Sequence, residues 1–216
     1  MSGRMHRPLA AVLIVCLCGL CFGVDIKVDA DATGGNDGTS WSDAYTQLQS
    51  AFAAAGSGDK ILVAAGTYKP DYDVNSSTHT GDRMATFQLI NGVSVKGGYA
   101  GFSEPIPSCR DIKLYETILT GDIGIADSNS DNSYHVVTGS GTDANAVLDG
   151  FTITQGYADE AVNDGRGGGM YNFSGSPTVK NCTFVENYAS AMGGGMFNQL
   201  SAPMITNCTF IRNRSK

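Results

Sequence analysis

The phrase "GGGMYN" spans residues 167–172, and "GGGMFN" spans residues 193–198, 26 residues further along the chain. A second phrase keeps the same interval, since "NCTFVEN" at 181–187 returns as "NCTFIRN" at 207–213. A motif that recurs at a fixed spacing of this size indicates a structure built from stacked repeats. The spacing therefore predicts that equivalent residues of neighbouring copies lie directly on one another.

The repeat extends in weaker form to earlier parts of the chain. Four segments align position by position: "INGVSVKGGYA" from Ile90, "LDGFTITQGYA" from Leu148, "VKNCTFVENYA" from Val179 and "ITNCTFIRNRS" from Ile205. Two columns of this alignment, six residues apart, hold only Gly or Asn, which tolerate a positive φ best. The first column is Gly92, Gly150, Asn181 and Asn207, and the second is Gly98, Gly156, Asn187 and Asn213. We interpret the two columns as two bends that every copy makes.

Between the bends, apolar residues alternate with Ser and Thr, which is typical of strands with one buried face. The inward columns are Val93, Phe151, Cys182 and Cys208, then Val95, Ile153, Phe184 and Phe210, with Ile90, Leu148, Val179 and Ile205 before the first bend. "KILVAAGTY" at 60–68 is an earlier and weaker copy of the repeat, with Ile61 and Val63 inward and Gly66 at the second bend. No copy has a helical period. The pattern predicts an all-β, parallel β-helix solenoid whose coils occupy residues 60–216.

The first 23 residues are typical of a secretory signal peptide. A basic start, "MSGRMHRP", precedes the apolar run "LAAVLIVCLCGL", and cleavage is expected after Gly23. The apolar run is shorter than the ~20 residues that a transmembrane helix needs. Cleavage would leave 12 basic against 21 acidic residues. This negative balance argues against nucleic acid or an anionic membrane as a partner.

Residues 24–59 are expected to form an N-terminal cap with one short helix. Ser42 can serve as its N-cap, and apolar residues recur at helical spacing up to Ala55, so the helix is predicted from Asp43 to Ala55. Such a helix can cover the open end of a β structure. Asp29 and Asp31 imitate the start of a calcium loop, but no Glu stands at its twelfth position. A polar turn is the favoured interpretation, with calcium as the alternative.

The repeats resemble a known family. "GGGM" followed by "FVEN" and "FIRN" resembles the GGA[ILV] and FxxN repeats of chlamydial polymorphic outer-membrane proteins. The front "VDADATGGNDGTSWSDAY…ILVAAGTYKP" is similar to the start of large exported proteins of the pectin-lyase-like class. The resemblance implies a right-handed β-helix and an extracellular, cell-surface or outer-membrane location. It is poorly specific for activity, because β-helices serve as lyases, hydrolases, adhesins and spacers.

A polysaccharide lyase of this fold would need acidic calcium ligands and a Lys or Arg base on one outer face. Asp149 and Lys180 occupy equivalent outward positions of neighbouring coils, and Arg166 lies between them in the sequence. A nearby loop carries three carboxylates, Asp122, Asp127 and Asp131. A surface ion pair beside a polar insertion explains these residues more simply, and no carboxylate pair has the fixed spacing of a glycoside hydrolase.

Two further columns have two interpretations each. Tyr99, Tyr157 and Tyr188 lie just past the second bend, where they could stack on a sugar or support a turn; we favour the turn. Cys182 over Cys208 could form a disulfide, but stacked inward thiols are favoured.

Together these features favour an exported, non-catalytic adhesin-like or binding module, whose partner could be an extracellular polysaccharide or a host or neighbouring cell surface. The alternative is a polysaccharide lyase or glycoside hydrolase of the same fold. No cofactor is predicted apart from the calcium alternative. The last coil stops within three residues of its second bend, without a covering helix. We therefore expect either further chain or self-association through this open end.

Overall fold

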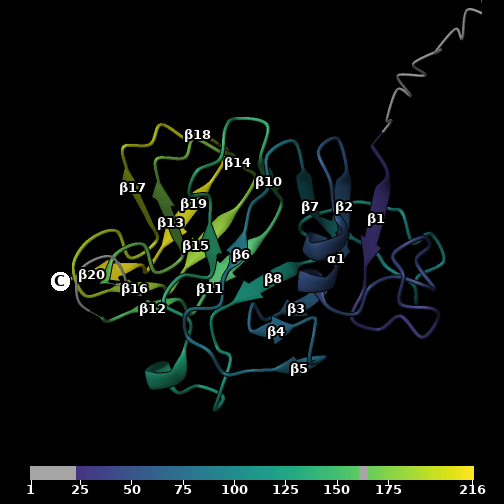
Figure 1. Ribbon diagram of the computed structural model, residues 1–216, viewed down its shortest axis with the longest axis horizontal. Coiled ribbons are helices and arrows are strands. Elements are labelled where there is room, and N and C mark those ends of the chain that lie inside the picture. Colours follow the sequence, from purple (N-terminus) through teal and green to yellow (C-terminus); the bar gives the residue numbers. More distant parts are fainter. Residues whose placement is uncertain (1–22, 161–164) are drawn as a thin grey trace, which may run out of the picture.

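The computed structural model describes residues 23–160 and 165–216. The chain is β-rich, with 35% strand and 6% helix, and its sheets are stacked and mostly parallel. The expected signal peptide lies outside the described residues, apart from Gly23. Figure 1 shows the sequence colours advancing from purple to yellow across the molecule, so each pass of the chain lies beside the previous one.

Parallel strands from successive passes form four sheets. The first sheet has the order β1 (Asp25–Val28), β2 (Lys60–Ala64), β7 (Ser94–Tyr99), β10 (Val147–Asp149), β14 (Thr178–Lys180) and β18 (Met204–Thr206). The second has the order β3 (Gly66–Tyr68), β8 (Thr117–Thr120), β11 (Thr152–Thr154), β15 (Thr183–Val185) and β19 (Thr209–Ile211). The third has the order β6 (Phe87–Gln88), β9 (Val137–Thr138), β13 (Met170–Phe173) and β17 (Met196–Gln199). The fourth has the order β12 (Tyr157–Ala158), β16 (Tyr188–Ala189) and β20 (Arg214–Ser215).

Four smaller elements of the described chain lie outside these sheets. Strands β4 (Tyr72–Asp73) and β5 (Thr78–His79) pair antiparallel, and η1 (Asn129–Asp131) is a short 3₁₀ helix. Helix α1 (Leu48–Ala54) packs its buried Leu48, Ala51 and Phe52 into the core at the β1 end of the molecule. Among the described residues, none of the helices is both long and apolar enough to span a bilayer.

The predicted register of the near-identical copies is confirmed. Phe184 pairs with Phe210 across β15 and β19, and their rings stack with centroids 4.9 Å apart and planes 6° from parallel. Met170 pairs with Met196 across β13 and β17. The phrase repeats because a residue that fits one pass must fit again on the next, one strand spacing (~4.8 Å) away.

The first bend is also confirmed. Gly150, Asn181 and Asn207 all have positive φ, at 86°, 54° and 52°. Asn207 donates an amide hydrogen bond to Asn181 Oδ1 at 3.4 Å, so the two side chains stack as expected. Asn181 in turn donates to Asp149 Oδ1 at 2.7 Å.

The second bend lies one residue earlier than predicted. The residues with positive φ are Gln155, Glu186 and Arg212, and not the Gly or Asn that follows each of them. Asn187 is buried and uses its amide to bond backbone groups of the preceding pass, Ile153 O and Gly156 N. Asn187 therefore serves this column through its hydrogen bonds and not through its backbone conformation.

The alignment of the Ile90 segment is wrong. Val95 pairs with Ile61 and Leu148, so it belongs to the column before the first bend and not to that of Ile153. The strand that pairs with β11 is β8, whose Leu119 lies beside Ile153. Gly92 and Gly98 therefore do not belong to the two bend columns. Gly66 is also misplaced, because it pairs with Thr117 after the first bend.

The predicted helix is too long at its start. It begins at Leu48, and its N-cap is Gln47, with no capping hydrogen bond from a side chain. Asp43 instead accepts hydrogen bonds from Gly35 N and Ser40 Oγ, which fold residues 34–43 into a polar turn. Tyr45 bonds to Lys27 O, which holds this stretch extended beside β1.

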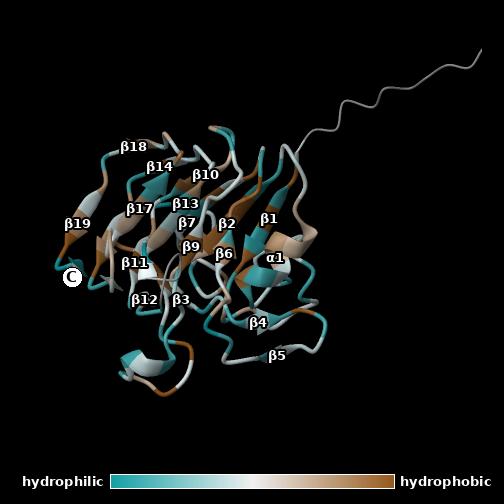
Figure 2. Ribbon diagram, turned by 60° about the vertical axis from the view of Figure 1, so that its left-hand side comes forward, coloured by the Kyte–Doolittle hydropathy of each residue, from teal (hydrophilic) through white to brown (hydrophobic). Residues whose placement is uncertain are grey.

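The core runs through the interior of the stack. Leu148 and Val179 from the first sheet meet Ile153 and Phe184 from the second and Met170 from the third, and all five side chains are buried. Figure 2 shows brown, hydrophobic strands inside the stack and mainly polar connections outside it. The polar outer bends are therefore free to carry a site.

Candidate functional site

A polar groove of about 520 Å³ lies where the second sheet passes into the fourth. Its lining is Asp127, Asn129, Gln155, Tyr157, Glu186, Asn187, Tyr188, Arg212 and Arg214. Gln155, Glu186 and Arg212 are the positive-φ residues of the second bend, so one backbone conformation projects three different polar side chains along one row. Asp127 and Asn129 come from the loop that carries η1.

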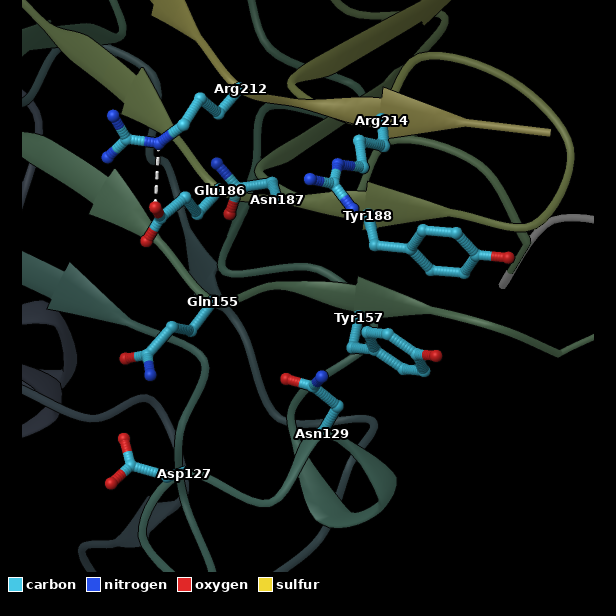
Figure 3. A pocket seen from close by; sticks show the side chains of 9 residues that line it. All are labelled: Asp127, Asn129, Gln155, Tyr157, Glu186, Asn187, Tyr188, Arg212 and Arg214. Carbon is cyan, nitrogen blue, oxygen red and sulfur yellow. Dashed lines mark hydrogen bonds and ion pairs between the residues drawn. The ribbon is translucent and has the colours of Figure 1, made fainter.

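Two tyrosines form a second row beside the first. Tyr157 and Tyr188 are in register, and their rings stack with centroids 4.6 Å apart and an angle of 24° between the planes. Figure 3 shows both hydroxyl groups pointing the same way, out of the stack. Arg214 occupies the next position of this column, paired with Tyr188. This second row therefore consists of two aromatic rings followed by one guanidinium group.

The third tyrosine predicted for this column, Tyr99, lies elsewhere. It pairs with Ala64, and its ring contacts Trp41 at a centroid distance of 5.6 Å. Arg110 lies over the same ring. Burial is the main cause that raises the pKa of Tyr99. The column prediction is wrong for Tyr99 because it used the mistaken register of β7.

Charges of both signs line the groove. Glu186 Oε1 and Arg212 Nε lie 2.7 Å apart, and both side chains are more than half exposed. A solvent-exposed pair of this kind contributes only ~0–1 kcal/mol, so a ligand can replace either partner at small cost. Asn187, which is 1% exposed, fixes the floor, because its amide bonds the backbone of two passes. The floor is held by buried hydrogen bonds, whereas the outer charges face solvent.

Asp149 and Lys180 are adjacent, as the sequence predicted, with Asp149 Oδ2 3.7 Å from Lys180 Nζ. Asp149 is, however, 3% exposed and already bound by other groups. Arg110 lies 3.1 Å from its Oδ1 and also donates to its backbone carbonyl, and Asn181 donates to Oδ1. Arg166 is not part of this cluster, since it donates to Gln199 and lies over the ring of Phe197. The carboxylate therefore anchors the loop that carries Arg110.

The acidic residues considered as calcium ligands occupy two separate places. Asp29 is buried and accepts hydrogen bonds from Asp31 N and Phe102 N, so it ties two loops together, while Asp31 is exposed. In the loop after β8, Asp122 accepts from Asp127 N at 3.3 Å. Across residues 23–160 and 165–216, no three His, Cys, Asp or Glu side chains come together in one cluster.

Three cysteines are present in the described part of the chain, Cys109, Cys182 and Cys208, and all are free thiols. The favoured interpretation of Cys182 and Cys208 as stacked thiols agrees with this state. Cys182 is buried and lies 3.2 Å from Lys180 O. Burial is the main cause that raises the pKa of Cys182 above its ordinary value.

Sequence reasoning missed five residues that matter to these two places. They are Gln155, Glu186, Arg212 and Arg214 in the groove, and Arg110 beside Asp149. A signal existed for the first three, because they form one column of the repeat immediately before the expected bend. Arg110 gave no such signal, since it lies in a long insertion outside the repeat.

Comparison with models of protein families, with curated proteins and with solved structures gave no match to this chain.

Proposed function

We propose that the protein is an exported right-handed parallel β-helix of the pectin-lyase-like class, acting as a non-catalytic, adhesin-like binding module at the cell surface. Its ligand is a saccharide, bound in the groove between the second and fourth sheets. The repeat resemblance and the leader-like first 23 residues support export. The stacked parallel sheets are compatible with the fold.

The observation that carries the binding proposal is the pairing of aromatic and planar polar side chains in the groove. Saccharides present apolar C–H faces and hydroxyl groups together, so they bind best where an aromatic ring lies beside fixed hydrogen-bonding groups. Tyr157 and Tyr188 supply the rings, and Gln155 and Glu186 supply amide and carboxylate groups. Arg212 and Arg214 add two guanidinium groups that match carboxylates, which favours an acidic polysaccharide.

Binding of polygalacturonate and of a neutral glucan to the purified protein tests the proposal. We expect the acidic polymer to bind more tightly, and the double variant Tyr157→Ala, Tyr188→Ala to weaken its affinity about tenfold, or ~1.4 kcal/mol. Tyr115→Ala is the matched control, because Tyr115 lies outside the groove. Equal binding by the double variant and the control would show that the groove does not hold the saccharide.

The alternative is a polysaccharide lyase, favoured by the close approach of Lys180 and Arg110 to Asp149. In such an enzyme, the free amine of Lys180 would remove the proton at C5 of a uronate while cations neutralise its carboxylate. The glycosidic C4–O bond would then break, which leaves a C4–C5 double bond, and the departing sugar oxygen would take up a proton. Calcium-dependent release of unsaturated uronides that is abolished by Lys180→Ala would establish that the protein is a lyase. We expect no such release, because Asp149 is occupied by its hydrogen bonds and ion pairs.

A further inference from the structure

The loop between β8 and β9 leaves the stack after Thr120 and returns at Ser133. Ser133 N donates to Gly121 O at 2.8 Å, so the two ends of the loop lie side by side at its base. Figure 1 shows the loop and its 3₁₀ helix projecting from the body of the molecule. Asp122 begins this loop, and Asp131, Asn132 and Ser133 end it.

Four side-chain oxygens at this base are buried and accept no hydrogen bond from any described residue. They are Asp122 Oδ1, Asp131 Oδ1, Asn132 Oδ1 and Ser133 Oγ. Asn132 is 1% exposed and Ser133 is 0% exposed. An unsatisfied buried polar group costs ~1–3 kcal/mol, and more when it is charged, so four in one loop call for a partner.

The hydrogen bonds of these side chains determine which oxygen of each has no hydrogen-bond partner. Asn132 Nδ2 donates to Gln155 O at 2.8 Å, so the amide cannot be exchanged end for end without placing two acceptors together. Asp122 Oδ2 accepts from Asp127 N, and Asp131 Oδ2 accepts from Ile125 N at 2.7 Å. Each carboxylate therefore binds the loop backbone with one oxygen and leaves the other for a second partner.

The missing partner must be positively charged or a strong donor. Within the described parts of the chain, no Lys, Arg or His forms an ion pair with Asp122 or Asp131. Two carboxylates, an amide oxygen and a hydroxyl form an oxygen-only set, which hard cations prefer. Asp127 does not belong to it, since it is exposed and lines the groove (Figure 3).

We propose that Asp122, Asp131, Asn132 and Ser133 bind one Ca²⁺ ion at the base of this loop. Ca²⁺ takes 6–8 oxygen ligands in flexible geometry, so backbone carbonyls and water complete the shell. Mg²⁺ fits less well, because it demands octahedral geometry and gives up its water reluctantly. With two carboxylates, the Kd is expected in the range of extracellular modules, ~10⁻⁴–10⁻³ M.

The ion would also hold one wall of the groove in place. Asn132 bonds Gln155 O, and Tyr157 N bonds Ser133 O at 2.8 Å, so the loop base is joined to both rows of the groove. The same loop carries Asp127 and Asn129 to the groove. Only this consequence rests on the proposed saccharide function; the ion site itself does not.

Calorimetric titration of the chelator-treated protein with CaCl₂, in the absence of any saccharide, tests the site. We expect one Ca²⁺ per chain, with MgCl₂ binding at least about tenfold more weakly. Asp122→Asn and Asp131→Asn should each abolish binding. Asp127→Asn, in the same loop but facing the groove, is the matched control and should bind as the unchanged protein does.

Thermal unfolding is a second measurement, which distinguishes loss of the Ca²⁺ site from a variant that binds Ca²⁺ poorly because its fold is damaged. At about 10 mM, about ten to one hundred times the expected Kd, Ca²⁺ should raise the Tm of the unchanged protein and of Asp127→Asn. It should leave the Tm of Asp122→Asn unchanged, while in chelator that variant should be at least as stable as the unchanged protein, because one buried charge is gone. Absence of Ca²⁺ binding, or a Ca²⁺-dependent Tm in Asp122→Asn and Asp131→Asn, would overturn the proposal and assign the four oxygens to ordered water. Saccharide binding that persists without Ca²⁺ would leave the ion site intact and remove only its link to the groove.

Discussion

At the scale of single residues, the asparagines of the second bend carry much of the contact between passes. Asn187 donates to Ile153 O at 2.9 Å and accepts from Gly156 N at 2.9 Å. Asn213 repeats the pattern one pass later, donating to Phe184 O at 2.8 Å and accepting from Asn187 N at 3.1 Å. Each amide thus binds one backbone donor and one backbone acceptor of the preceding pass.

Replacement of Asn187 by Ala should be strongly destabilising. It leaves Gly156 N buried without its acceptor and removes a second hydrogen bond from Ile153 O, which stays in the β11–β15 ladder, so the free energy of unfolding should fall by ~1–3 kcal/mol. Urea unfolding measures the change. Asn213→Ala is the matched control and should cost less, because Asn213 lies in the last pass, where water can reach the freed groups. Equal losses in the two variants would contradict the role given to burial.

Cys182 gives the fold a dependence on alkaline pH. Its burial raises its pKa, so in the native protein the thiol stays protonated above ~8.5, where an unfolded cysteine ionises. A group whose pKa is higher in the folded state stabilises it below the unfolded pKa, and this stabilisation is lost as the pH rises through the folded pKa. From about pH 8 to about pH 10, the free energy of unfolding should therefore fall by up to ~1.4 kcal/mol per pH unit relative to Cys182→Val. Parallel pH profiles for the two proteins would refute this.

At the scale of elements, the near-identical copies could be predicted from the sequence and the insertions could not. Strands β13–β20 lie where the 26-residue phrase requires, because like residues fit like surroundings in adjacent passes. Strand β8 was missed because a long insertion precedes it and because Glu116 and Asp122, not Gly or Asn, stand in the two columns used for the alignment. The alignment accepted "GVSVKGGYA" in its place, since short alternating strands resemble one another.

The two places of functional interest differ in the same way. The groove residues Tyr157 and Tyr188 follow the repeat, so their stacking could be predicted. The loop base was suspected only through Asp122, because its Asn132 and Ser133 acquire their meaning from burial and from the backbone contact to Gly121. The sequence shows which residue types the loop contains. Which of their atoms lack hydrogen-bond partners depends on how the loop folds, and this could not be predicted from the sequence.

At the scale of the whole molecule, the last pass exposes an edge. Strands β17, β18, β19 and β20 each have a neighbour on one side only. Their apolar residues are exposed accordingly, with Met204 at 61% and Phe210 at 47%. An open strand edge beside exposed apolar side chains is a template for pairing with another chain.

We expect a purified chain of these 216 residues to self-associate through this edge at micromolar to millimolar concentration. Phe210→Lys should shift it towards monomer, because the charge would be buried in the contact. Met84→Lys, which replaces an apolar residue that is 60% exposed and lies away from the edge, should not. Light scattering after gel filtration measures the mass; a monomer for the unchanged protein throughout this range would show that the edge is stable uncovered.

The constant spacing of 26 residues also bears on how such a chain can change over generations. Cys182, Phe184 and Asn187 have counterparts in Cys208, Phe210 and Asn213 that occupy equivalent positions one pass later. Loss of one copy of the repeat from the gene would therefore splice each strand onto an equivalent of itself, and gain of a copy would do the reverse. The rod would shorten or lengthen by a single strand spacing, ~4.8 Å, with every ladder still in step. Recombination between the near-identical copies can thus alter the reach of the molecule while leaving the fold untouched.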